Sequence, residues 1–480
     1  MSLKRGVGSV GESVAREEYR AVLESLFQRR RFGIRPGLET IEALLTGLGH
    51  PERKFPAIHI TGSKGKGSTA TMVQAILTAH GLKTGLFTSP HLASYRERIR
   101  LDGRLISRSA VVDGVTRVEA VARKAEAAGT TDRPATFFEV TTALAFDWFA
   151  HEAVDAAVVE VGIGGRLDAT NVLDSRVGVV TTIELEHTDI LGPDLASIAQ
   201  EKSGIFHRGM TGVVGELPEA ALRVVEKEAT RLGVPLWHAG KEVRVENRTL
   251  SADGQTFTVR VPGRSFPDLF IPLLGRFQPA NAALAVAAAV RFSHATGLEL
   301  DGAKTASGLV GVRWPGRLER VAKRPELFYD VAHTPESARA LAQSLAEISP
   351  LASPEESVIV FGCLREKNAA RILDALSPLA RTVVVVPLRS DRGARPSELR
   401  VAAVGRFPRI VEARSAAEGV ALARAGTGPD GFTLVVGSDY LVGELMRSAE
   451  DQDEPDLSDP GLPPPGTVAS KPASSPKESG

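Results

Sequence analysis

Residues 57–69 read AIHITGSKGKGST and hold the pattern that decides the fold. A short apolar run over 57–60 ends in a glycine-rich turn, and a helical pattern follows over 70–80. Three glycines lie in the turn: Gly62, Gly65 and Gly67. They allow backbone N–H groups to converge on an anion, and the helix N-terminus adds partial positive charge. The order of strand, turn and helix therefore predicts a phosphate-binding loop.

Lys66 lies within this loop, where its side chain would reach the terminal phosphates of a nucleotide. The loop is not a strict Walker A motif, because Ile60 stands where the first glycine of that motif belongs. Gly67 also separates the lysine from Ser68. A glycine-rich turn with surface lysines is the alternative interpretation of this segment taken alone.

The composition is that of a soluble globular protein with more than one domain. A chain of 480 residues is too long for one ordinary core, so we expect two or three domains. The 58 basic residues balance the 58 acidic ones, and 43% of the residues are hydrophobic. This balance gives no global electrostatic reason to expect nucleic acid or an anionic membrane as a partner, and we predict neither.

The cysteine content and the apolar runs indicate the compartment. Cys363 is the only cysteine, so no internal disulfide forms and a reducing cytosol is the natural environment. The first residues lead into no apolar stretch of signal-peptide length, and no run reaches the roughly 18–20 apolar residues of a membrane span. We therefore expect a cytoplasmic protein.

Short apolar runs alternate with helical patterns along most of the chain, which predicts an α/β fold with doubly wound sheets. Several runs are unbroken, as expected for parallel strands that are covered on both faces. The predicted strands span 57–60, 156–161, 177–182, 328–331, 357–361, 382–386 and 433–436. The clearest helical patterns span 70–80, 139–151, 279–294 and 337–345.

These patterns predict two domains. Residues 15–296 would form a P-loop ATPase-like domain, and residues 299–449 a Rossmann-like α/β domain. The stretch 242–271 alternates polar and apolar residues, which predicts a small antiparallel hairpin attached to the first sheet. Residues 1–14 are predicted to be a flexible start, before a helix over 17–29. A disordered tail is predicted over 450–480, where large apolar residues are almost absent.

Candidate chemical groups follow the predicted strands, and ligands bind at the carboxyl edge of a parallel sheet. Glu160 ends a buried run, and an acid in that place downstream of a phosphate loop usually serves Mg²⁺. His187 ends another strand beside three carboxylates, which favours a ligand role. Asp330 and His333 follow the first strand of the second domain, where an acid commonly accepts ribose hydroxyls.

Each of these groups has a purely structural alternative. Glu160 could cap a helix or form an ion pair, His187 could be a structural or surface residue, and Asp330 could cap a helix. Taken without a family, the residues indicate an ATP- and Mg²⁺-dependent enzyme with its site between two α/β domains. Hydrolysis, phosphoryl transfer and ligation remain open at this point.

The motifs together resemble the folylpolyglutamate synthase/dihydrofolate synthase family, a branch of the Mur ligase superfamily. The resemblance runs from about Tyr19 to Leu445 and so covers most of the chain. Its first motifs are the loop 61–68, the segment 88–92 with 97–100, and Thr136-Phe-Phe-Glu139. Its later motifs are the segment 160–171, Glu201-Lys-Ser-Gly204, Asn281 after Gln278, and Pro315-Gly-Arg317.

The resemblance implies a role for each matching residue. Gly62, Gly65, Lys66, Gly67 and Ser68 would hold the β- and γ-phosphates of ATP, with Asn281, Arg317 and Asp330 gripping the rest of the nucleotide. Ser89 and Glu160 would bind one Mg²⁺, and His187 a second. Lys202 matches the lysine that this superfamily carbamylates. His333 would lie near phosphate or the incoming glutamate, so that Lys66, Lys202, His187, Arg317 and His333 form the catalytic set.

The implied reaction is an ATP-dependent ligation of L-glutamate to a pteroate or folate carboxylate through an acyl phosphate. The implied partners are these two substrates, and we expect a monomer. A superfamily ligase with another carboxylate acceptor is the closest alternative. A muropeptide ligase fits less well, because only about 56 residues precede the first strand. An inactive nucleotide-binding paralogue is the alternative from another class of protein.

Four sites depart from the usual pattern of the family. Val331 and Thr334 stand where a glycine and an asparagine are common, and Glu186 replaces an aspartate before His187. Ser63-Lys64 replaces a common Thr-Asn in the loop, so a second positive charge lies near the phosphates. These departures bear on the choice of acceptor more than on ATP.

Overall fold

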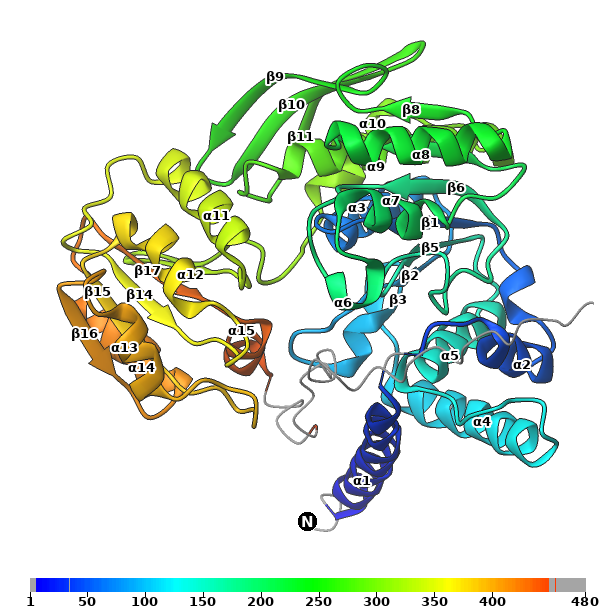
Figure 1. Cartoon of the computed structure of the whole chain (residues 1–480), viewed down its shortest axis with the longest axis horizontal. Coiled ribbons are helices and arrows are strands. Elements are labelled where there is room, and N and C mark those ends of the chain that lie inside the picture. Colours follow the sequence, from blue (N-terminus) through cyan, green and yellow to red (C-terminus); the bar gives the residue numbers. More distant parts are fainter. Residues whose placement is uncertain (1–5, 34, 449–453, 455–480) are drawn as a thin grey trace, which may run out of the picture.

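Two α/β bodies lie side by side in the computed structural model, each built around its own sheet (Figure 1). The structure describes residues 6–33, 35–448 and 454. We call residues 6–310 the N-terminal half and residues 311–448 the C-terminal half. The predicted two-sheet α/β fold is confirmed.

The N-terminal half contains an eight-stranded sheet in the order β4-β3-β2-β5-β1-β6-β7-β8. Its strands are β1 (Ala57–Thr61), β2 (Thr84–Phe87), β3 (Ile99–Leu101), β4 (Arg104–Leu105), β5 (Ala156–Glu160), β6 (Ser175–Val180), β7 (Thr211–Val214) and β8 (Leu236–His238). All neighbours from β2 to β8 pair in parallel, whereas β3 and β4 are antiparallel. The central β1 is buried along its whole length, which explains why most of its residues are apolar.

Helices cover both faces of this sheet. On one face, Ile58 and Ile60 share a core with α3 (Lys66–Ala79) and α9 (Gln278–Thr296), and α10 (Gly302–Val310) adjoins them. The other face packs against two helix groups. They are α1 (Gly6–Gln28), α2 (Glu39–Gly47), α4 (Arg108–Ala127) and α5 (Phe137–His151) at one end, and α7 (Leu195–Ser203) with α8 (Glu219–Leu232) at the other. The sheet is therefore doubly wound, and its carboxyl edge stays free for ligands.

Two predicted helix starts were too late. Helix α3 begins at Lys66, directly after Gly65, whereas the pattern predicted a start at Ala70. The first turn of α3 is polar and glycine-containing, so hydrophobic periodicity could not reveal it. Helix α1 begins at Gly6, so the flexible start predicted for 1–14 is wrong over 6–14.

The predicted hairpin is a separate three-stranded sheet, so its attachment to the first sheet is wrong. Strands β9 (Arg244–Ser251), β10 (Gly254–Val261) and β11 (Arg264–Ile271) form an antiparallel meander with β10 in the centre. Phe257 and Val259 of β10 pack into the core that contains α9. The alternation of polar and apolar residues predicted the strands correctly. It does not show whether the apolar face belongs to the first sheet or to a separate sheet that packs on a helix.

The C-terminal half contains a six-stranded sheet in the order β12-β13-β17-β14-β15-β16. Its strands are β12 (Glu319–Lys323), β13 (Glu326–Tyr329), β14 (Val358–Phe361), β15 (Thr382–Val385), β16 (Arg409–Glu412) and β17 (Phe432–Val436). Only β12 is antiparallel. One face packs on α11 (Pro335–Ile348), α12 (Ala369–Leu376) and α13 (Pro396–Ala403), and the other on α14 (Ala416–Gly426) and α15 (Asp439–Met446).

Exposed ion pairs join the three-stranded sheet to the C-terminal half. Arg248 of β9 lies 2.7 Å from Glu347 of α11, and Lys323 of β12 lies 2.9 Å from Asp253 in the turn before β10. Figure 1 shows this sheet extending from the N-terminal half toward α11. We call these two pairs the ionic seam.

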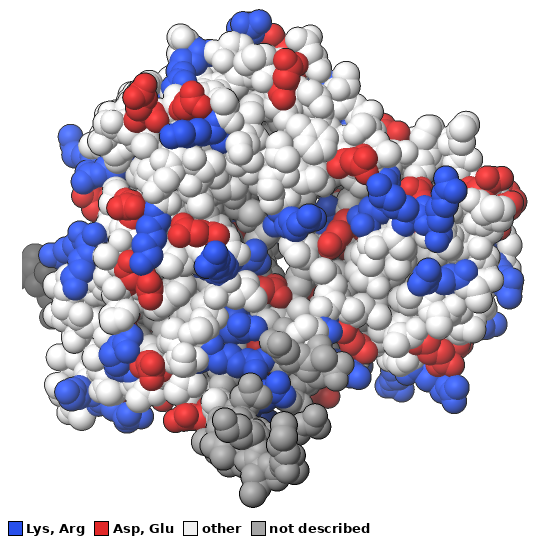
Figure 2. Space-filling view, turned by 180° about the vertical axis from the view of Figure 1, so that it is seen from behind, with Lys and Arg blue, Asp and Glu red and all other residues white. Residues whose placement is uncertain are grey.

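The surface carries both signs of charge, and Figure 2 shows them interspersed over the face seen from behind. In the part of the chain that the structure describes, no helix is both long enough and apolar enough to cross a membrane. The tail predicted as disordered over 450–480 lies outside the described residues, apart from Glu454.

Candidate active site

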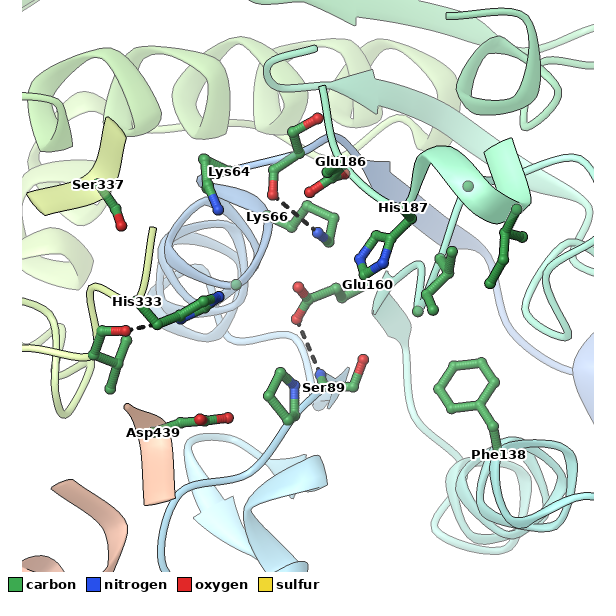
Figure 3. A pocket seen from close by; sticks show the side chains of 18 of the residues that line it. Lys64, Lys66, Ser89, Phe138, Glu160, Glu186, His187, His333, Ser337 and Asp439 are labelled. Atoms are coloured by element: carbon green, nitrogen blue, oxygen red, sulfur yellow. Dashed lines mark hydrogen bonds between the residues drawn. The ribbon is translucent and has the colours of Figure 1, made fainter. Parts of the chain in front are cut away.

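A cavity of about 1530 Å³ lies between the two halves, at the carboxyl edges of both sheets. The N-terminal half lines it with residues that follow β1, β2, β5 and β6, and the C-terminal half with residues that follow β13, β14 and β17. Figure 3 shows the side chains of Lys66, Glu160 and His187 converging from one wall, with His333 on the opposite side. The topology thus gathers the predicted residues from distant parts of the sequence.

The phosphate loop requires two of its glycines. Gly62 has φ +148°, and a Cβ atom there would lie 1.9 Å from Oγ1 of Thr181. Gly65 has φ +83°, and its Cβ would lie 2.5 Å from Oδ1 of Asn281. Both positions combine an unusual backbone conformation with a close neighbour, so they exclude other residues. The loop therefore holds its N–H groups in a fixed concave arrangement.

Lys66 and Gly67 connect the loop to the acid of β5. Nζ of Lys66 donates to the carbonyl oxygen of Gly62 at 2.9 Å, so the ammonium bends back over the loop. A Cβ at Gly67 would lie 2.5 Å from the ring of Trp314 and 3.3 Å from Oε2 of Glu160. Gly67 therefore allows the Glu160 carboxylate to approach the start of α3.

Glu160 lies beside the loop because β5 pairs in register with β1, which places it opposite Ile60. Its Oε2 accepts a hydrogen bond from the backbone N–H of Ser89 at 3.1 Å. Burial raises the pKa of Glu160 to about 7, although Lys66 and the Ser89 N–H act in the opposite direction. A cation beside this buried carboxylate would favour its charged form.

The donor set around Glu160 suits Mg²⁺ rather than a transition metal. Among the residues that the structure describes, no three Asp, Glu, His or Cys side chains form a ready-made metal cluster. Mg²⁺ is usually bound by one or two carboxylates, with water and substrate phosphates completing its shell. Glu160, the Ser89 hydroxyl and a phosphate in the loop fit that requirement.

His187 has a left-handed backbone with φ +47°, which is uncommon for a residue other than glycine. It precedes the short helix α6 (Thr188–Leu191), and its ring lies near Glu160 and Lys66 in Figure 3. Burial lowers the pKa of His187, although Glu186 acts against it. The ring is thus kept neutral, and a lone pair is available for a ligand.

Lys202 of α7 lies beneath the cavity wall and is 2% exposed. Its Nζ donates to Oε1 of Glu186 at 2.8 Å. Burial lowers the pKa of Lys202 to about 8 despite this partner. Burial would raise the pKa of Glu186, but Lys66 and Lys202 outweigh it and hold that pKa at about 2. Glu186 is therefore an ionised link between the buried lysine and the phosphate loop.

The C-terminal half supplies Arg317 and Asp330 to the cavity. Burial raises the pKa of Asp330 to about 6, against the effect of Arg317. Its two oxygens accept from the backbone N–H groups of Leu318 and Ala332, each at 2.7 Å. Asp330 therefore braces the loop that carries Arg317, and it is itself part of the cavity lining.

His333 is a neutral imidazole with a defined orientation. Burial lowers its pKa to about 3, and Lys367 and Lys64 add to the effect. Its Nδ1 lies 3.0 Å from the carbonyl oxygen of Val331, so the proton is assigned to Nδ1. The Nε2 lone pair is then free to accept a hydrogen bond within the cavity.

Almost all of the predicted site residues line the cavity. Only Gly62, at the base of the loop, and Lys202, behind Glu186, are set back from its wall. Asn281 is buried, and its Nδ2 donates to Gln278 at 3.0 Å beside Gly65. The side chains thus meet at one site, although their chemical roles stay predictions.

Several other cavity residues had no role assigned from the sequence, among them Arg98, Phe138, Asp168, Lys367 and Asp439. Lys367 and Asp439 follow β14 and β17, so their strand-end positions could have revealed them. Arg98 and Phe138 belong to motifs of the family, but neither position carries a local signal for a cavity. Only the tertiary fold brings them to the site.

Two departures from the family pattern fit the local backbone. Val331 is not among the described residues with a left-handed backbone, so this position needs no glycine. Thr334 is the N-cap of α11, and its hydroxyl accepts from the N–H of Ser337 at 3.2 Å. Both substitutions therefore keep the loop after β13 intact.

Comparison with known proteins places this site in a class. The Mur ligase middle domain matches residues 60–289, and the Mur ligase glutamate ligase domain matches residues 316–439. The phosphate loop lies in the first match, and Arg317, Asp330 and His333 lie in the second. The fold and the site are those of a Mur-type ATP-dependent ligase.

A curated relative narrows the class to a family. The dihydrofolate synthase/folylpolyglutamate synthase of Mycobacterium tuberculosis is 40% identical over 78% of this chain and 79% of its own length. The chain belongs to the folylpolyglutamate synthase/dihydrofolate synthase family.

Solved structures agree with this assignment. The M. tuberculosis folylpolyglutamate synthase complexed with ADP has a TM-score of 0.82 at 36% identity. The match covers 89% of this chain and 97% of the chain in that structure. A folylpolyglutamate synthase complex with AMPPCP and folate has a TM-score of 0.77 at 30% identity. The match covers 89% of this chain and 98% of the chain in that structure.

Proposed function

We propose that this protein joins L-glutamate to the carboxylate of a pteroate or folate with the hydrolysis of ATP to ADP and phosphate. One observation carries the proposal: a phosphate loop with a buried acid faces a cationic loop of the other half across a cavity of about 1530 Å³. The names of the relatives, and the nucleotide and folate complexes among them, support the choice of substrates.

The chemistry requires activation of a poor acyl donor. A carboxylate oxygen attacks the γ-phosphorus of ATP, the bond to ADP breaks, and an acyl phosphate forms. The amine of glutamate then attacks the acyl carbon, and inorganic phosphate leaves from a tetrahedral intermediate. Both steps build negative charge on phosphoryl oxygens, which Lys66 and Arg317 are suited to stabilise.

Ser89 and Glu160 would hold one Mg²⁺, and His187 would contribute to a second site. The cation would supply positive charge at the β- and γ-phosphate oxygens. Imidazole is a less usual ligand for Mg²⁺ than oxygen, so the second site depends on further oxygen donors from phosphate and water.

Carbamylation of Lys202 fits the surroundings of this residue. Only a neutral amine reacts with CO₂, and burial lowers the pKa of Lys202 to about 8, which raises the neutral fraction. A carbamate would place an anion beside ionised Glu186, which is favourable only with a cation between them. We therefore expect carbamylation and metal binding to depend on each other.

His333 is suited to the second step. The glutamate amine is protonated in solution and must lose a proton before it attacks. With its pKa lowered to about 3, His333 is too weak a base to take that proton, so its Nε2 lone pair would instead accept a hydrogen bond from the amine, and its backbone bond to Val331 fixes the orientation. Location in the cytoplasm, a monomeric state, and the domain limits 15–296 and 299–449 stay predictions.

An assay with purified protein tests the proposal. ATP and L-glutamate are supplied with dihydropteroate or with tetrahydrofolate, ADP release is followed, and the products are identified by mass. We expect ADP release only when both an acceptor and glutamate are present. Turnover without an acceptor, or none with either acceptor, would contradict a folate ligase and favour the alternatives of another acceptor or an inactive paralogue.

A further inference from the structure

Glu454 lies beyond the last helix of the C-terminal half and is bound by the N-terminal half. Its carboxylate is buried, with 6% exposed. Oε1 accepts from the hydroxyl of Tyr19 at 3.0 Å and from Oγ of Ser94 at 2.7 Å. Oε2 accepts from the backbone N–H of Tyr95 at 3.1 Å. We call Tyr19, Ser94 and Tyr95 the carboxylate pocket.

The carboxylate pocket is built from buried groups of two elements. Tyr19 belongs to α1, and Ser94 and Tyr95 begin a short 3-10 helix that ends at Arg98; each is at most 3% exposed. Four consecutive backbone N–H groups point to carboxylates here. Glu97 accepts those of residues 92, 93 and 94, and Glu454 accepts the fourth. Without Glu454, three buried donors would lose this acceptor.

The segment 89–98, which contains Ser94 and Tyr95 of the carboxylate pocket, touches both the cavity and the last helix. It begins at Ser89, beside Glu160, and ends at Arg98, which lines the cavity. Gly443 of α15 packs against its middle, where a Cβ would lie 2.1 Å from the carbonyl oxygen of Leu92. Glu454 follows α15 in the chain, so its bond to the pocket adds a second attachment of the C-terminal half to this segment.

We propose that the carboxylate pocket is an intramolecular binding site for Glu454 and holds the two halves closed around the cavity. The occupant is an anionic side chain of the same protein, recognised by three converging donors. Release of Glu454 would let the C-terminal half move away with Arg317 and Asp330. The binding of nucleotide by residues of both halves rests on the proposed function, whereas the closure itself does not.

Small-angle X-ray scattering and ADP titration of the full chain test this inference. Glu454→Gln removes the negative charge, and Tyr19→Phe removes one donor from the pocket. We expect each variant to increase the radius of gyration without ligand, and saturating ADP to restore it. The Kd for ADP should rise by about three- to tenfold, because the closed form is less populated. The double variant should change the radius of gyration and the Kd little more than either single variant, because both substitutions act on the same contact between Tyr19 and Glu454.

Asp456→Asn is the matched control, since it removes the same charge two residues further along the chain. If Glu454→Gln had the same radius of gyration and the same Kd for ADP as this control, the inference would be overturned. A lowered Tm with an unchanged radius and Kd would also overturn it, because Glu454 would then only stabilise the fold. Failure of the ligase assay in the wild type would leave the scattering result intact, so the two proposals are separable.

Discussion

Two lysines of the phosphate loop have different surroundings although they are two residues apart. Lys66 bends back onto the loop carbonyl of Gly62. Lys64 is fixed through its backbone, since its N–H donates to Oγ1 of Thr182 at 2.8 Å and its carbonyl accepts from Thr181 at 2.6 Å. Burial lowers the pKa of Lys64, and Glu186 and Glu184 oppose this. The loop would therefore offer two positive charges to a bound anion, each from a different direction.

Lys66→Ala should lower the rate of ADP release by about 10²–10³-fold, because it removes a preorganised charge from the developing phosphoryl charge. The rate is measured with saturating substrates, and binding is checked separately by ADP titration. Lys54→Ala, at an exposed surface position, is the control and should behave as wild type. Wild-type turnover in Lys66→Ala would remove this lysine from the mechanism.

The buried histidine His59 should make the stability of the fold depend on pH. It is fully buried in β1, and its Nε2 lies 2.8 Å from Oγ1 of Thr170. Burial lowers its pKa to about 3, and His207 adds to this. As the pH falls below about 6.5 the unfolded chain binds the proton first, so stability present above this pH is lost toward pH 3.

His59→Gln keeps an N–H donor near Thr170 but removes the titration. Between about pH 7.5 and pH 5, the wild type should lose about 2 kcal/mol more unfolding free energy than this variant. Urea denaturation at the two pH values measures the difference. His151→Gln, at an exposed position, should retain the acid sensitivity of the wild type. Equal acid sensitivity in His59→Gln would show that His59 is not the source.

Single residues were predictable where their local chemistry was explicit. Lys66 and Glu160 follow strands and carry charge, so the sequence indicated both. Lys202 needed the family resemblance, because a lysine in a helix gives no sign of burial. Glu454 could not be predicted, since its partners are more than 350 positions away in the chain. Long-range contacts of this kind leave no local pattern.

At the scale of elements, the strand ends and helix starts position the site. Helix α3 begins inside the loop, so its first N–H groups are available to the proposed phosphate site. Gly65 permits this start, and Gly81 follows the end of the same helix with a similar φ of +90°. The two glycines differ in surroundings, since nothing lies within 4 Å of a Cβ at Gly81.

Gly65→Ala and Gly81→Ala therefore separate backbone strain from crowding. Gly81→Ala should cost about 1–2 kcal/mol of unfolding free energy and leave ADP binding unchanged. Gly65→Ala should cost more, because its Cβ would also displace Asn281 from its bond with Gln278, and it should abolish detectable ADP binding. Thermal unfolding and ADP titration measure both effects. Equal effects of the two variants would contradict a role for the close contact.

The sequence predicted elements well where periodicity and burial agree. Buried parallel strands such as β1 and β17 are short, fully buried and mostly apolar, and their length separates them from the longer helices. The meander β9–β11 was only partly predicted, because alternation reveals strands but not their partners. Its packing on α9 depends on a helix that comes later in the chain.

At the scale of the whole molecule, the proposed nucleotide site is divided between the halves. Lys66 and Glu160 come from one sheet edge, and Arg317 and Asp330 come from the other. Neither half offers all of these groups alone, so nucleotide binding and approach of the halves should be coupled. Sequence patterns predicted the two sheets but could not predict how their edges face each other.

Arg317→Ala tests this coupling. ADP at about 100 times its Kd should stabilise the wild type by about 2.7 kcal/mol, observed as a rise in Tm. The variant should show a smaller rise at the same ADP concentration, because the C-terminal half contributes less to binding. Arg313→Ala, a nearby exposed arginine, is the control. An unchanged rise in Arg317→Ala would place the nucleotide on the N-terminal half alone.

The ionic seam makes the molecule responsive to its electrolyte. Its pairs are exposed, with Lys323 and Asp253 at 73% and 69%, so each contributes little to stability. Dissolved salt screens such pairs over about 10 Å at 0.1 M. The outer edge of the two halves can thus part and rejoin at small cost, and the ease of that movement is set by the ionic strength of the surroundings.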